Sequence, residues 1–360
     1  MRSIHVGVIG TGWCGGIRAE TCRASPLVKG LHVAEIDERR LGAIADKTRP
    51  DSATTDYKKL LARADLDAVM ICATPESTHH PMAKESLLAG KHVLLEKPIA
   101  LTLAEADELI GIARSKQLLF TIGYSQRFNP KFAYVKKSIE DGTIGEPVSA
   151  LVSRHITRGL GNKISGRTKL SPAAMEATDD IDFLLWCLAP RKPVRVYAQE
   201  VRKIMKATHD APDCVWMIVT MDDGSVFTIG AGWVLPPAYP NFSSTWIEIT
   251  GTQGAILVDD SHRDVVLNTM QKGIVFPLST MPGEKVSHVY AGPMEAETLH
   301  FLECVASGRQ PLVTAEHARL VMQVYQAADQ SAADIVAQAL RAYLQMPASD
   351  HNLQSAVHRI

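Results

Sequence analysis

Three glycines near the start of the chain, Gly10, Gly12 and Gly15, have the G-x-G-x-x-G spacing of a turn that binds a pyrophosphate. An apolar run, residues 4–9, leads into the turn and a helical segment follows it. Glycines permit a tight backbone that approaches the phosphates closely, and N–H groups at the helix start can face the anion. This context predicts dinucleotide binding by the turn residues Gly10, Thr11, Gly12, Trp13, Cys14 and Gly15.

A second apolar strand ends on Glu35, where a carboxylate can accept hydrogen bonds from the adenosine ribose of a dinucleotide. Asp37 competes for this role, although its place before a helix that begins near Arg39 favours an N-cap. An acid at the strand end repels a 2′-phosphate and favours NAD, whereas Arg39 and Arg40 could bind that phosphate and favour NADP. We expect NAD, with NADP as the alternative.

The composition is that of an ordinary soluble protein with enough bulk for two cores, because 46% of the 360 residues are hydrophobic and 21% are charged. With 38 basic and 39 acidic residues, no overall field favours nucleic acid or an anionic membrane. No apolar stretch approaches the roughly 18 residues of a membrane span. The six cysteines lack metal or disulfide spacing and no leader is visible, which predicts a cytoplasmic protein without a metal. Cys14 is expected to pack as a small side chain rather than act as a nucleophile.

Strands and helices alternate through residues 1–124, which predicts a dinucleotide-binding α/β domain with a doubly wound parallel sheet of the Rossmann type. The continuous apolar run 66–73 indicates a buried parallel strand. Ligands lie beyond the carboxyl ends of such strands, so Ala73, Thr74 and Pro75 are expected in the cofactor cleft. The expected strands are 4–9, 31–35, 53–54, 66–73, 91–95 and 118–123, and the expected helices are 39–47, 57–64, 80–89 and 103–115.

Residues 125–346 change to longer alternating runs, which predicts an α+β domain with an open, mostly antiparallel sheet and helices on one face. Residues 222–225 have the composition of a hairpin turn. The expected strands are 148–156, 194–201, 215–221, 226–231, 246–250, 255–258 and 265–267. The expected helices are 128–140, 294–306 and 315–343, and a loose polar tail is expected at 347–360.

With these stretches in place, the chain resembles the Gfo/Idh/MocA family, the oxidoreductases related to glucose-fructose oxidoreductase and inositol dehydrogenase. The resemblance covers almost the whole chain in order. Besides the glycine turn, it rests on Ala73-Thr74-Pro75 with His79, Ala89-Gly90-Lys91-His92-Val93, Glu96-Lys97-Pro98, Gly123-Tyr124 with Arg127-Phe128-Asn129-Pro130, and Asp182-Phe183-Leu184-Leu185-Trp186. The resemblance implies a nucleotide domain followed by a substrate-binding domain whose open sheet mediates dimers or tetramers.

Lys97 is the strongest catalytic candidate, both from the resemblance and from its place at the end of a parallel strand. A lysine there can hydrogen-bond a substrate hydroxyl and favour its alkoxide character as hydride leaves. Burial in such a cleft is expected to lower its pKa toward the working pH. The resemblance also places Glu96 at the cofactor and implies a cis peptide bond before Pro98.

The chain departs from the family at Asp179, because members commonly carry H-x-x-D where this chain has Asp179 and Asp182. If the segment is helical, Glu176, Asp179 and Asp182 fall on one i, i+3 track and face one substrate site. Asp179 could be a native base with a raised pKa, or Lys97 could transfer the proton while Asp182 orients substrate. Alternatively, a histidine has been replaced. A carboxylate in this run can instead have no catalytic role and only stabilise the N-terminus of a helix, which is the favoured interpretation of Asp180.

Several further side chains are weaker candidates for the same cleft. His79 matches a family position at the cofactor, although a histidine at a helix start is often structural. Gln126 and Arg127 could contact nicotinamide or substrate, and Arg127 could equally form an ion pair. Arg154 and His155 could bind substrate oxygens or end a solvated strand. An aromatic loop, either a lid or an oligomer contact, is expected around Trp233, Tyr239 and Phe242.

The expected function is that of an NAD(P)-dependent dehydrogenase which moves hydride between nicotinamide and a secondary alcohol or ketone of a sugar, cyclitol or related polyol. The substrate class comes from the resemblance. A relative that acts on an aromatic dihydrodiol or a semialdehyde hydrate is the alternative enzyme. A cofactor-binding sensor without turnover is the alternative outside enzymes, favoured by Asp179 and opposed by Lys97. A methyltransferase that uses the glycine turn is opposed by Glu96-Lys97-Pro98.

Overall fold

The first half of the chain forms a parallel sheet with the strand order β3-β2-β1-β4-β5-β6. The computed structural model describes residues 2–261, 264–278 and 285–333. The order reverses between β1 and β4, so the carboxyl ends of these strands open a crevice for a ligand. The doubly wound Rossmann sheet expected from the sequence is confirmed. Its strands are β1 (Ile4–Ile9), β2 (Val28–Ala34), β3 (Ser52–Thr54), β4 (Ala68–Ile71), β5 (His92–Leu95) and β6 (Phe120–Ile122).

Helices follow the strands as the alternation predicts, and polar side chains fix where several of them begin. Asp37 accepts a hydrogen bond from the Arg40 amide and caps the second helix, as expected. Thr102 and Glu105 form a capping box at the start of the helix expected at 103–115. The third helix ends three residues earlier than expected. These helices are α1 (Trp13–Ala24), α2 (Glu38–Thr48), α3 (Tyr57–Leu61), α4 (His79–Leu88) and α5 (Leu103–Ser115).

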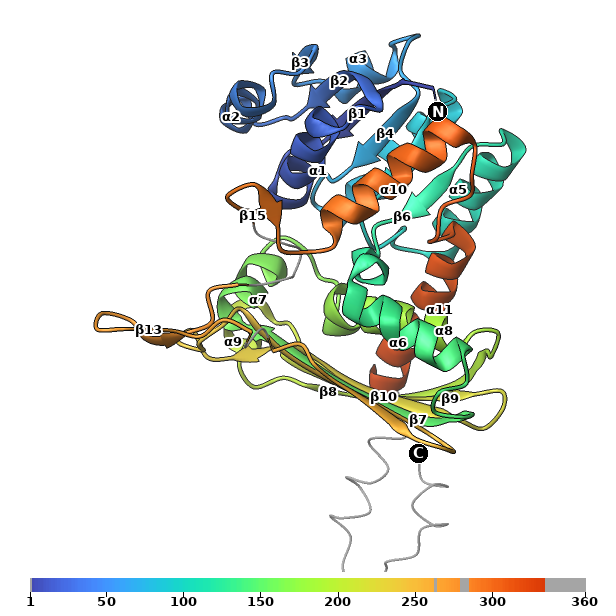
Figure 1. The fold of residues 1–360 in the computed structure, drawn as a ribbon, viewed down its shortest axis with the longest axis vertical. Helices are drawn as coiled ribbons and strands as arrows, with labels where there is room; N and C mark the ends of the chain where they lie inside the picture. Colours follow the sequence, from blue (N-terminus) through green and yellow to red (C-terminus); the bar gives the residue numbers. More distant parts are fainter. Residues whose placement is uncertain (1, 262–263, 279–284, 334–360) are drawn as a thin grey trace, which may run out of the picture.

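The second half is built on a sheet with the order β12-β11-β7-β10-β9-β8, in which β7 and β10 are parallel and the other neighbours are antiparallel. The mostly antiparallel sheet expected from the sequence is confirmed. Figure 1 shows it nearly edge-on, with helices on one face only. Its strands are β7 (Pro147–Thr157), β8 (Pro193–Val201), β9 (Cys214–Met221), β10 (Val226–Leu235), β11 (Ser243–Gly251) and β12 (Ala255–Asp259).

A small hairpin replaces the strand expected at 265–267. Leu267 begins β13 (Leu267–Thr269), which pairs with β14 (Gly273–Val275) outside the main sheet. Val265 and Val266 precede it and are exposed. Their β-branched side chains suggested a strand of the main sheet, but they belong to an arm that projects from the domain (Figure 1). A second short hairpin pairs β15 (Lys285–Val286) with β16 (Val289–Tyr290).

Short helices line the covered face of the sheet. The sequence indicated the helix α6 (Pro130–Glu140), although a 3-10 turn, η2 (Ser125–Phe128), precedes it. The sequence also suggested a helix for part of the segment that forms a π-helical turn, η3 (Ala173–Ala177), and α8 (Thr178–Leu188). It missed α7 (Arg158–Ser165) and α9 (Lys206–His209).

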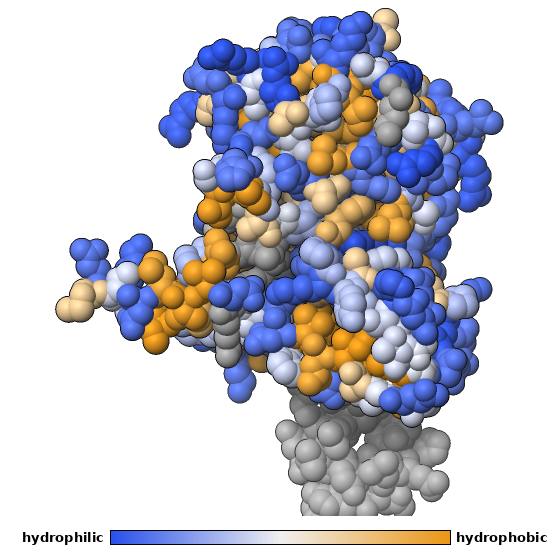
Figure 2. Space-filling view, in the orientation of Figure 1, coloured by the Kyte–Doolittle hydropathy of each residue, from blue (hydrophilic) through white to orange (hydrophobic). Residues whose placement is uncertain are grey.

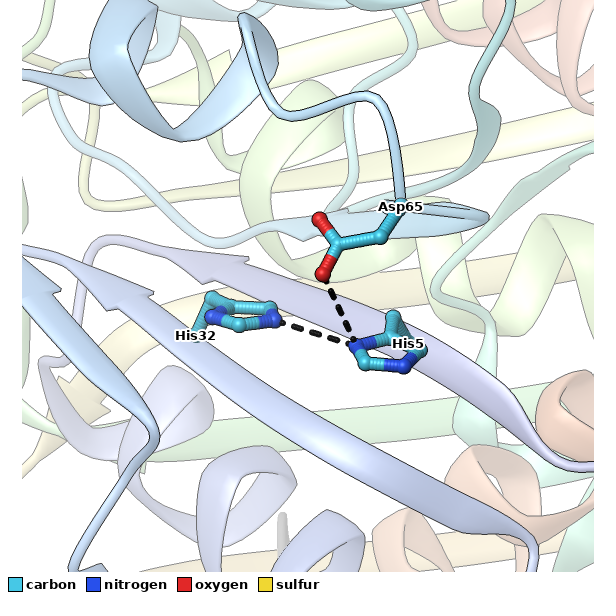
Figure 3. Close-up of side chains that lie close together, drawn as sticks. All are labelled: His5, His32 and Asp65. Carbon is cyan, nitrogen blue, oxygen red and sulfur yellow. Dashed lines mark hydrogen bonds and ion pairs between the residues drawn. The ribbon is translucent and has the colours of Figure 1, made fainter.

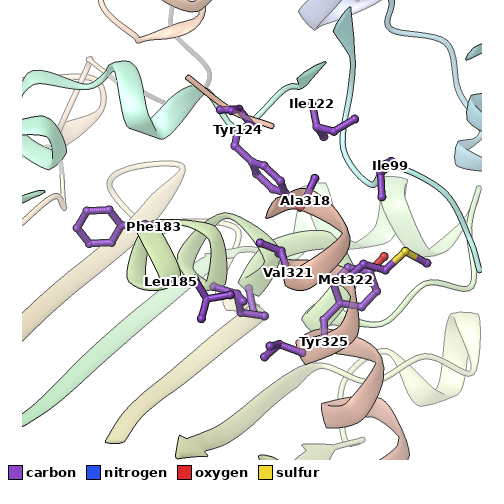
Figure 4. Close-up of a cluster of buried hydrophobic side chains, with 14 of the residues drawn as sticks. Ile99, Ile122, Tyr124, Phe183, Leu185, Ala318, Val321, Met322 and Tyr325 are labelled. Atoms are coloured by element: carbon purple, nitrogen blue, oxygen red, sulfur yellow. The ribbon is translucent and has the colours of Figure 1, made fainter. Parts of the chain in front are cut away.

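The last helices tie the two halves together. The side chains of Phe301, Leu302 and Val305 on α10 (Met294–Ser307) pack into a core cluster with Val6 and Val8 of β1, so this late segment covers the first sheet (Figure 1). The helix α11 (Ala315–Ala333) lies between α8 and the end of β6, as Tyr124, Val321 and Tyr325 show in Figure 4. Residues 334–343 of the expected last helix and the expected tail lie outside the described residues. Within the described ranges no helix is long and apolar enough to span a membrane.

Candidate active site

A cleft of about 680 Å³ lies where the carboxyl ends of β1, β2, β4 and β5 face the second domain. The expected cofactor residues Gly10, Gly12, Trp13, Cys14 and Glu35 line it, together with Ala73, Thr74, Pro75, His79, Glu96, Lys97 and Gln126. On the opposite side the lining comes from β7, α7 and η3, which contribute Ile156, Leu160, Ile164, Met175 and Glu176. The cleft therefore joins a nucleotide site to a second compartment.

The glycine turn has the shape that a pyrophosphate requires. Gly10 has a φ of +82°, and a Cβ there would lie 2.8 Å from the Ala73 backbone. A Cβ on Gly15 would lie 1.9 Å from the Gly10 carbonyl oxygen, whereas a Cβ on Gly12 would meet nothing within 4 Å. Gly10 and Gly15 thus permit the tight turn and the close helix, and Gly12 leaves open space where phosphates can approach.

Glu35 organises the turn as well as facing the cleft. One carboxylate oxygen accepts hydrogen bonds from the Thr11 amide (2.7 Å) and hydroxyl (3.1 Å), and the other accepts from the Asp37 amide and Arg40. Burial by itself raises the pKa of Glu35. These hydrogen bonds and the charge of Arg40 lower the pKa by more, so it stands below its ordinary value and the group stays ionised. Arg40 is half-exposed and can move away when ribose hydroxyls take its place.

Replacing Glu35 with alanine is expected to weaken NAD binding by about 10–100-fold, the scale of lost hydrogen bonds to a charged group. NADP binding should weaken less, because the variant also loses a charge that repels the 2′-phosphate and frees Arg40. Fluorescence titration with both cofactors measures this difference. Asp37→Ala is the matched control and should leave the NAD to NADP ratio unchanged, since Asp37 caps α2. Equal losses for both cofactors in Glu35→Ala would move the ribose role away from Glu35.

Lys97 follows β5 and reaches into the cleft beside two carboxylates. Its ammonium donates to the Met175 carbonyl at 2.5 Å and lies 3.2 Å from Asp179 Oδ2. Burial lowers the pKa of Lys97, but the charges of Asp179 and Glu176 raise it by more, so it stands above its ordinary value. The expectation that burial brings this pKa down is therefore wrong, because it left the neighbouring carboxylates out of account. The peptide bond from Lys97 to Pro98 is cis, as the resemblance implied.

Glu176, on the π-helical turn η3, and Asp179, at the start of α8, both line the cleft. Glu176 accepts a 2.6 Å hydrogen bond from the indole N–H of Trp233, a fully buried residue of β10. Burial raises the pKa of Glu176 above its ordinary value despite Lys97 and Trp233. Trp233 therefore anchors a carboxyl group and is not part of an exposed aromatic loop, whereas Phe242 packs edge-on against Trp13 at the cleft.

Asp182 does not reach the cleft, although it was expected to share one track with Glu176 and Asp179. It is fully buried and binds Arg127 through two hydrogen bonds of 2.6 and 2.9 Å. Three residues turn a helix by only about 300°, so a track of i, i+3 positions drifts by about 120° over two steps. Of the two alternatives for Arg127, the structure shows the ion pair.

Arg154 and His155 also lie away from the cleft lining. Arg154 points to the covered side of β7 and is 1% exposed, with its guanidinium 2.7–2.9 Å from both oxygens of Asp180. His155 points to the other side, where its ring lies 5.9 Å from the ring of Trp216. Neighbouring residues of a strand face opposite ways, so Arg154 and His155 could not both face one substrate.

Arg154→Met is expected to lower the free energy of unfolding by about 3–5 kcal/mol, because it leaves Asp180 buried without its bidentate partner. The double variant with Asp180→Leu removes both charges and should recover most of that loss. Urea unfolding followed by circular dichroism measures both. A single variant as stable as the parent would show that this pair contributes little.

Four further charged residues shape the site, and sequence patterns did not reveal them. Arg18 on α1 is fully buried and binds Glu96 at 2.6 Å and Glu297 of α10 at 2.7 Å, which fixes Glu96 beside Lys97. Arg167 binds Glu76 at 2.7 Å and links the second domain to the loop after β4.

The remaining cofactor candidates support the cleft walls. His79 is buried, and its two ring nitrogens lie 2.8 Å from the Pro98 carbonyl oxygen and 3.1 Å from that of Ala73. It therefore holds the segments after β4 and β5 together at the cleft. Burial raises the pKa of Cys14 to about 12, which suits a packing role and not a nucleophile.

Comparison with known proteins finds a family match for both halves of the chain. Residues 4–124 match the model of the oxidoreductase family with an NAD-binding Rossmann fold, and residues 136–335 match that family's C-terminal alpha/beta domain. The scyllo-inositol 2-dehydrogenase (NAD(+)) of Bacillus subtilis is 25% identical over 334 residues, which is 92% of this chain and 94% of that protein. An uncharacterized oxidoreductase of the same organism, YrbE, is 25% identical over 92% of this chain and 95% of its own.

Solved structures show the same fold. The scyllo-inositol dehydrogenase of Lactobacillus casei, solved with bound NAD(H) and scyllo-inositol, superposes with a TM-score of 0.79 and 20% identity. That match covers 92% of this chain and 97% of the other.

Proposed function

This chain belongs to the Gfo/Idh/MocA family of NAD-dependent oxidoreductases, and from that premise we propose that it moves hydride between NAD and a secondary hydroxyl group of a cyclitol or related polyol. The observation that carries the proposal is Lys97 between Asp179 and the Met175 carbonyl at the floor of the cleft. The relatives named inositol dehydrogenases support the substrate class. The glycine turn and Glu35 fit NAD by the geometry described above.

Lys97 can stabilise an alkoxide in this arrangement. An ammonium has three N–H donors, of which two point to Met175 and Asp179 and the third is left for a substrate oxygen in the cleft. Its raised pKa keeps it protonated at neutral pH, so it does not serve as the base. Asp179 is then the group that takes the hydroxyl proton, while NAD, when bound, accepts the hydride.

A substrate panel tests the proposal. Purified protein with NAD is mixed with inositol isomers, sugars and dihydrodiols, and the absorbance of reduced nicotinamide is followed. We expect turnover with at least one cyclitol or polyol. Binding of NAD without turnover on any alcohol would instead support a sensor.

A second candidate, an alcohol with one reactive hydroxyl on a largely apolar body, is favoured by the walls of the cleft. On the side of the second domain these are mostly apolar, namely Ile156, Leu160, Ile164, Met175 and Phe242. An inositol hydroxyl that faces these apolar side chains would lack a partner, which costs about 1–3 kcal/mol for each group left unsatisfied. A higher kcat/KM for cyclic dihydrodiols than for inositols would decide for this candidate.

We also propose that the protein forms a homodimer or homotetramer through the uncovered face of the second sheet. The strand register sets apolar side chains in two adjacent rows across this face. The exposed members are Leu151, Tyr197, Trp216, Ile218, Trp246 and Leu257. Figure 2 shows further apolar side chains gathered on the projecting arm that carries β13. Light scattering of the parent and of Trp216→Glu tests this.

The six free cysteines are consistent with a cytoplasmic location, which remains a proposal.

A further inference from the structure

Two histidines and an aspartate meet at the end of the first sheet that lies away from the cleft. His5 is near the start of β1, His32 is on β2, and Asp65 lies in the loop before β4 (Figure 3). One ligand atom from each lies within 4.8 Å of the other two. His5 is five residues before the glycine turn, about 16 Å along an extended strand, so the proposed catalysis does not use this cluster.

The distances in the cluster suit a shared cation better than direct hydrogen bonds. His5 Nδ1 lies 3.4 Å from His32 Nε2 and 3.5 Å from Asp65 Oδ2. Both distances exceed the usual 2.7–3.2 Å of an N–H hydrogen bond. Ligands about 2.0–2.1 Å from a tetrahedral Zn²⁺ stand about 3.3–3.4 Å apart, which is close to both values. The planes of the two rings are nearly parallel, at 10°, and their centroids lie 5.7 Å apart.

The surroundings hold the two imidazoles in this arrangement. The other ring nitrogen of His32 lies 2.9 Å from Ser52 Oγ, a contact that fixes the ring and leaves Nε2 directed at His5. Gly30 provides the room, because a Cβ there would lie 2.4 Å from His5 Nδ1 and 3.2 Å from His32 Nε2.

We propose that His5, His32 and Asp65 form a binding site for a divalent transition metal ion, with Zn²⁺ as the favoured ion and water as the fourth ligand. Two imidazoles and one carboxylate are common ligands of zinc. The ion would join β1, β2 and the loop before β4 and so stabilise the first domain. Arg63 competes, because its guanidinium lies 2.8 Å from Asp65 Oδ2, the oxygen nearest His5.

Sequence spacing gave no indication of this site, because its ligands come from three separate segments. The expectation of no metal rested on the absence of a His, Cys or carboxylate pair that has ligand spacing and lies close to another such pair in the chain. In the parallel register His5 pairs with Gly30 of β2, and His32, two residues further on, points to the same face of the sheet, so residues distant in the chain become neighbours there.

Isothermal titration of the full chain with Zn²⁺, and with Co²⁺ followed by its visible absorption, tests the proposal. We expect one site of micromolar or tighter affinity, a tetrahedral Co²⁺ spectrum and a rise in Tm of several degrees with zinc. His5→Gln and Asp65→Asn each remove one partly exposed ligand and should weaken binding at least tenfold. If both variants bind zinc as tightly as the parent, the proposal is wrong.

Two further variants keep all three ligands and so test the geometry of the site rather than the identity of its ligands. Gly30→Ala should displace the His5 ring and weaken zinc binding at least tenfold while the fold, measured by circular dichroism, is retained. Arg63→Gln should tighten zinc binding several-fold, because it frees Asp65. Unchanged affinity in Gly30→Ala, or weaker affinity in Arg63→Gln, would contradict the proposed geometry.

Discussion

Lys97→Ala is expected to lower kcat by at least ~100-fold, the usual scale for a positioned acid–base group. NAD affinity should change less than threefold, because the turn and Glu35 stay in place. The reason is the third N–H of the ammonium, which is the donor that a substrate oxygen meets on the floor of the cleft. Steady-state turnover on the best alcohol of the panel and fluorescence titration with NAD measure the two quantities.

Lys137→Ala is the matched control, since Lys137 is an exposed lysine whose partner is Asp141 on the same helix. It should leave both quantities unchanged. Turnover of Lys97→Ala within threefold of the parent would remove Lys97 from the mechanism.

Asp179→Asn is expected to lower kcat by about 100-fold, because an amide cannot take the hydroxyl proton that Asp179 is proposed to accept. Glu176→Gln is the matched control from the same cleft. Burial raises the pKa of Glu176, and glutamine keeps an oxygen that accepts the hydrogen bond of Trp233. This control should lose less than tenfold in kcat. Turnover measured between pH 6 and 9 gives both results.

Asp179→His separates the open interpretations of this position. A native carboxylate base predicts that histidine lowers turnover at neutral pH. Higher turnover would show that this chain has lost a histidine that the family arrangement uses. A larger loss in Glu176→Gln than in Asp179→Asn would assign the proton to Glu176 instead.

The fold was largely predictable from local patterns. Continuous apolar runs that end at turn residues mark β1, β4 and β5, and the strand alternation around residues 215–231 marks the second sheet. Helix starts were predictable where a polar cap is present, as at Asp37 and Thr102. The arm at β13 was not, because the exposed Val265 and Val266 are β-branched residues typical of a sheet strand.

The cleft was predictable where one motif carries a role, as at Gly10 and Lys97. It was not predictable where partners lie far apart in the chain. Asp182 and Arg154 were expected at the substrate and Arg127 was a candidate for it, yet Arg127 pairs with Asp182, and Arg154 pairs with Asp180, so that each pair neutralises its own buried charges. The sequence shows which residue types are present but not which side chains contact one another. The raised pKa of Lys97 depends on such contacts with neighbouring carboxylates.

Transfer of deuterium from a cyclitol to NAD tests the central claim most directly. The full chain is incubated with NAD and an inositol that carries deuterium at its ring carbons, and the nicotinamide is then examined by mass spectrometry and NMR. We predict one deuterium on the nicotinamide ring for each turnover, with transfer at least ~100-fold slower in Lys97→Ala. Tight NAD binding with no deuterium on the nicotinamide, from inositols or any other labelled alcohol, would contradict the account.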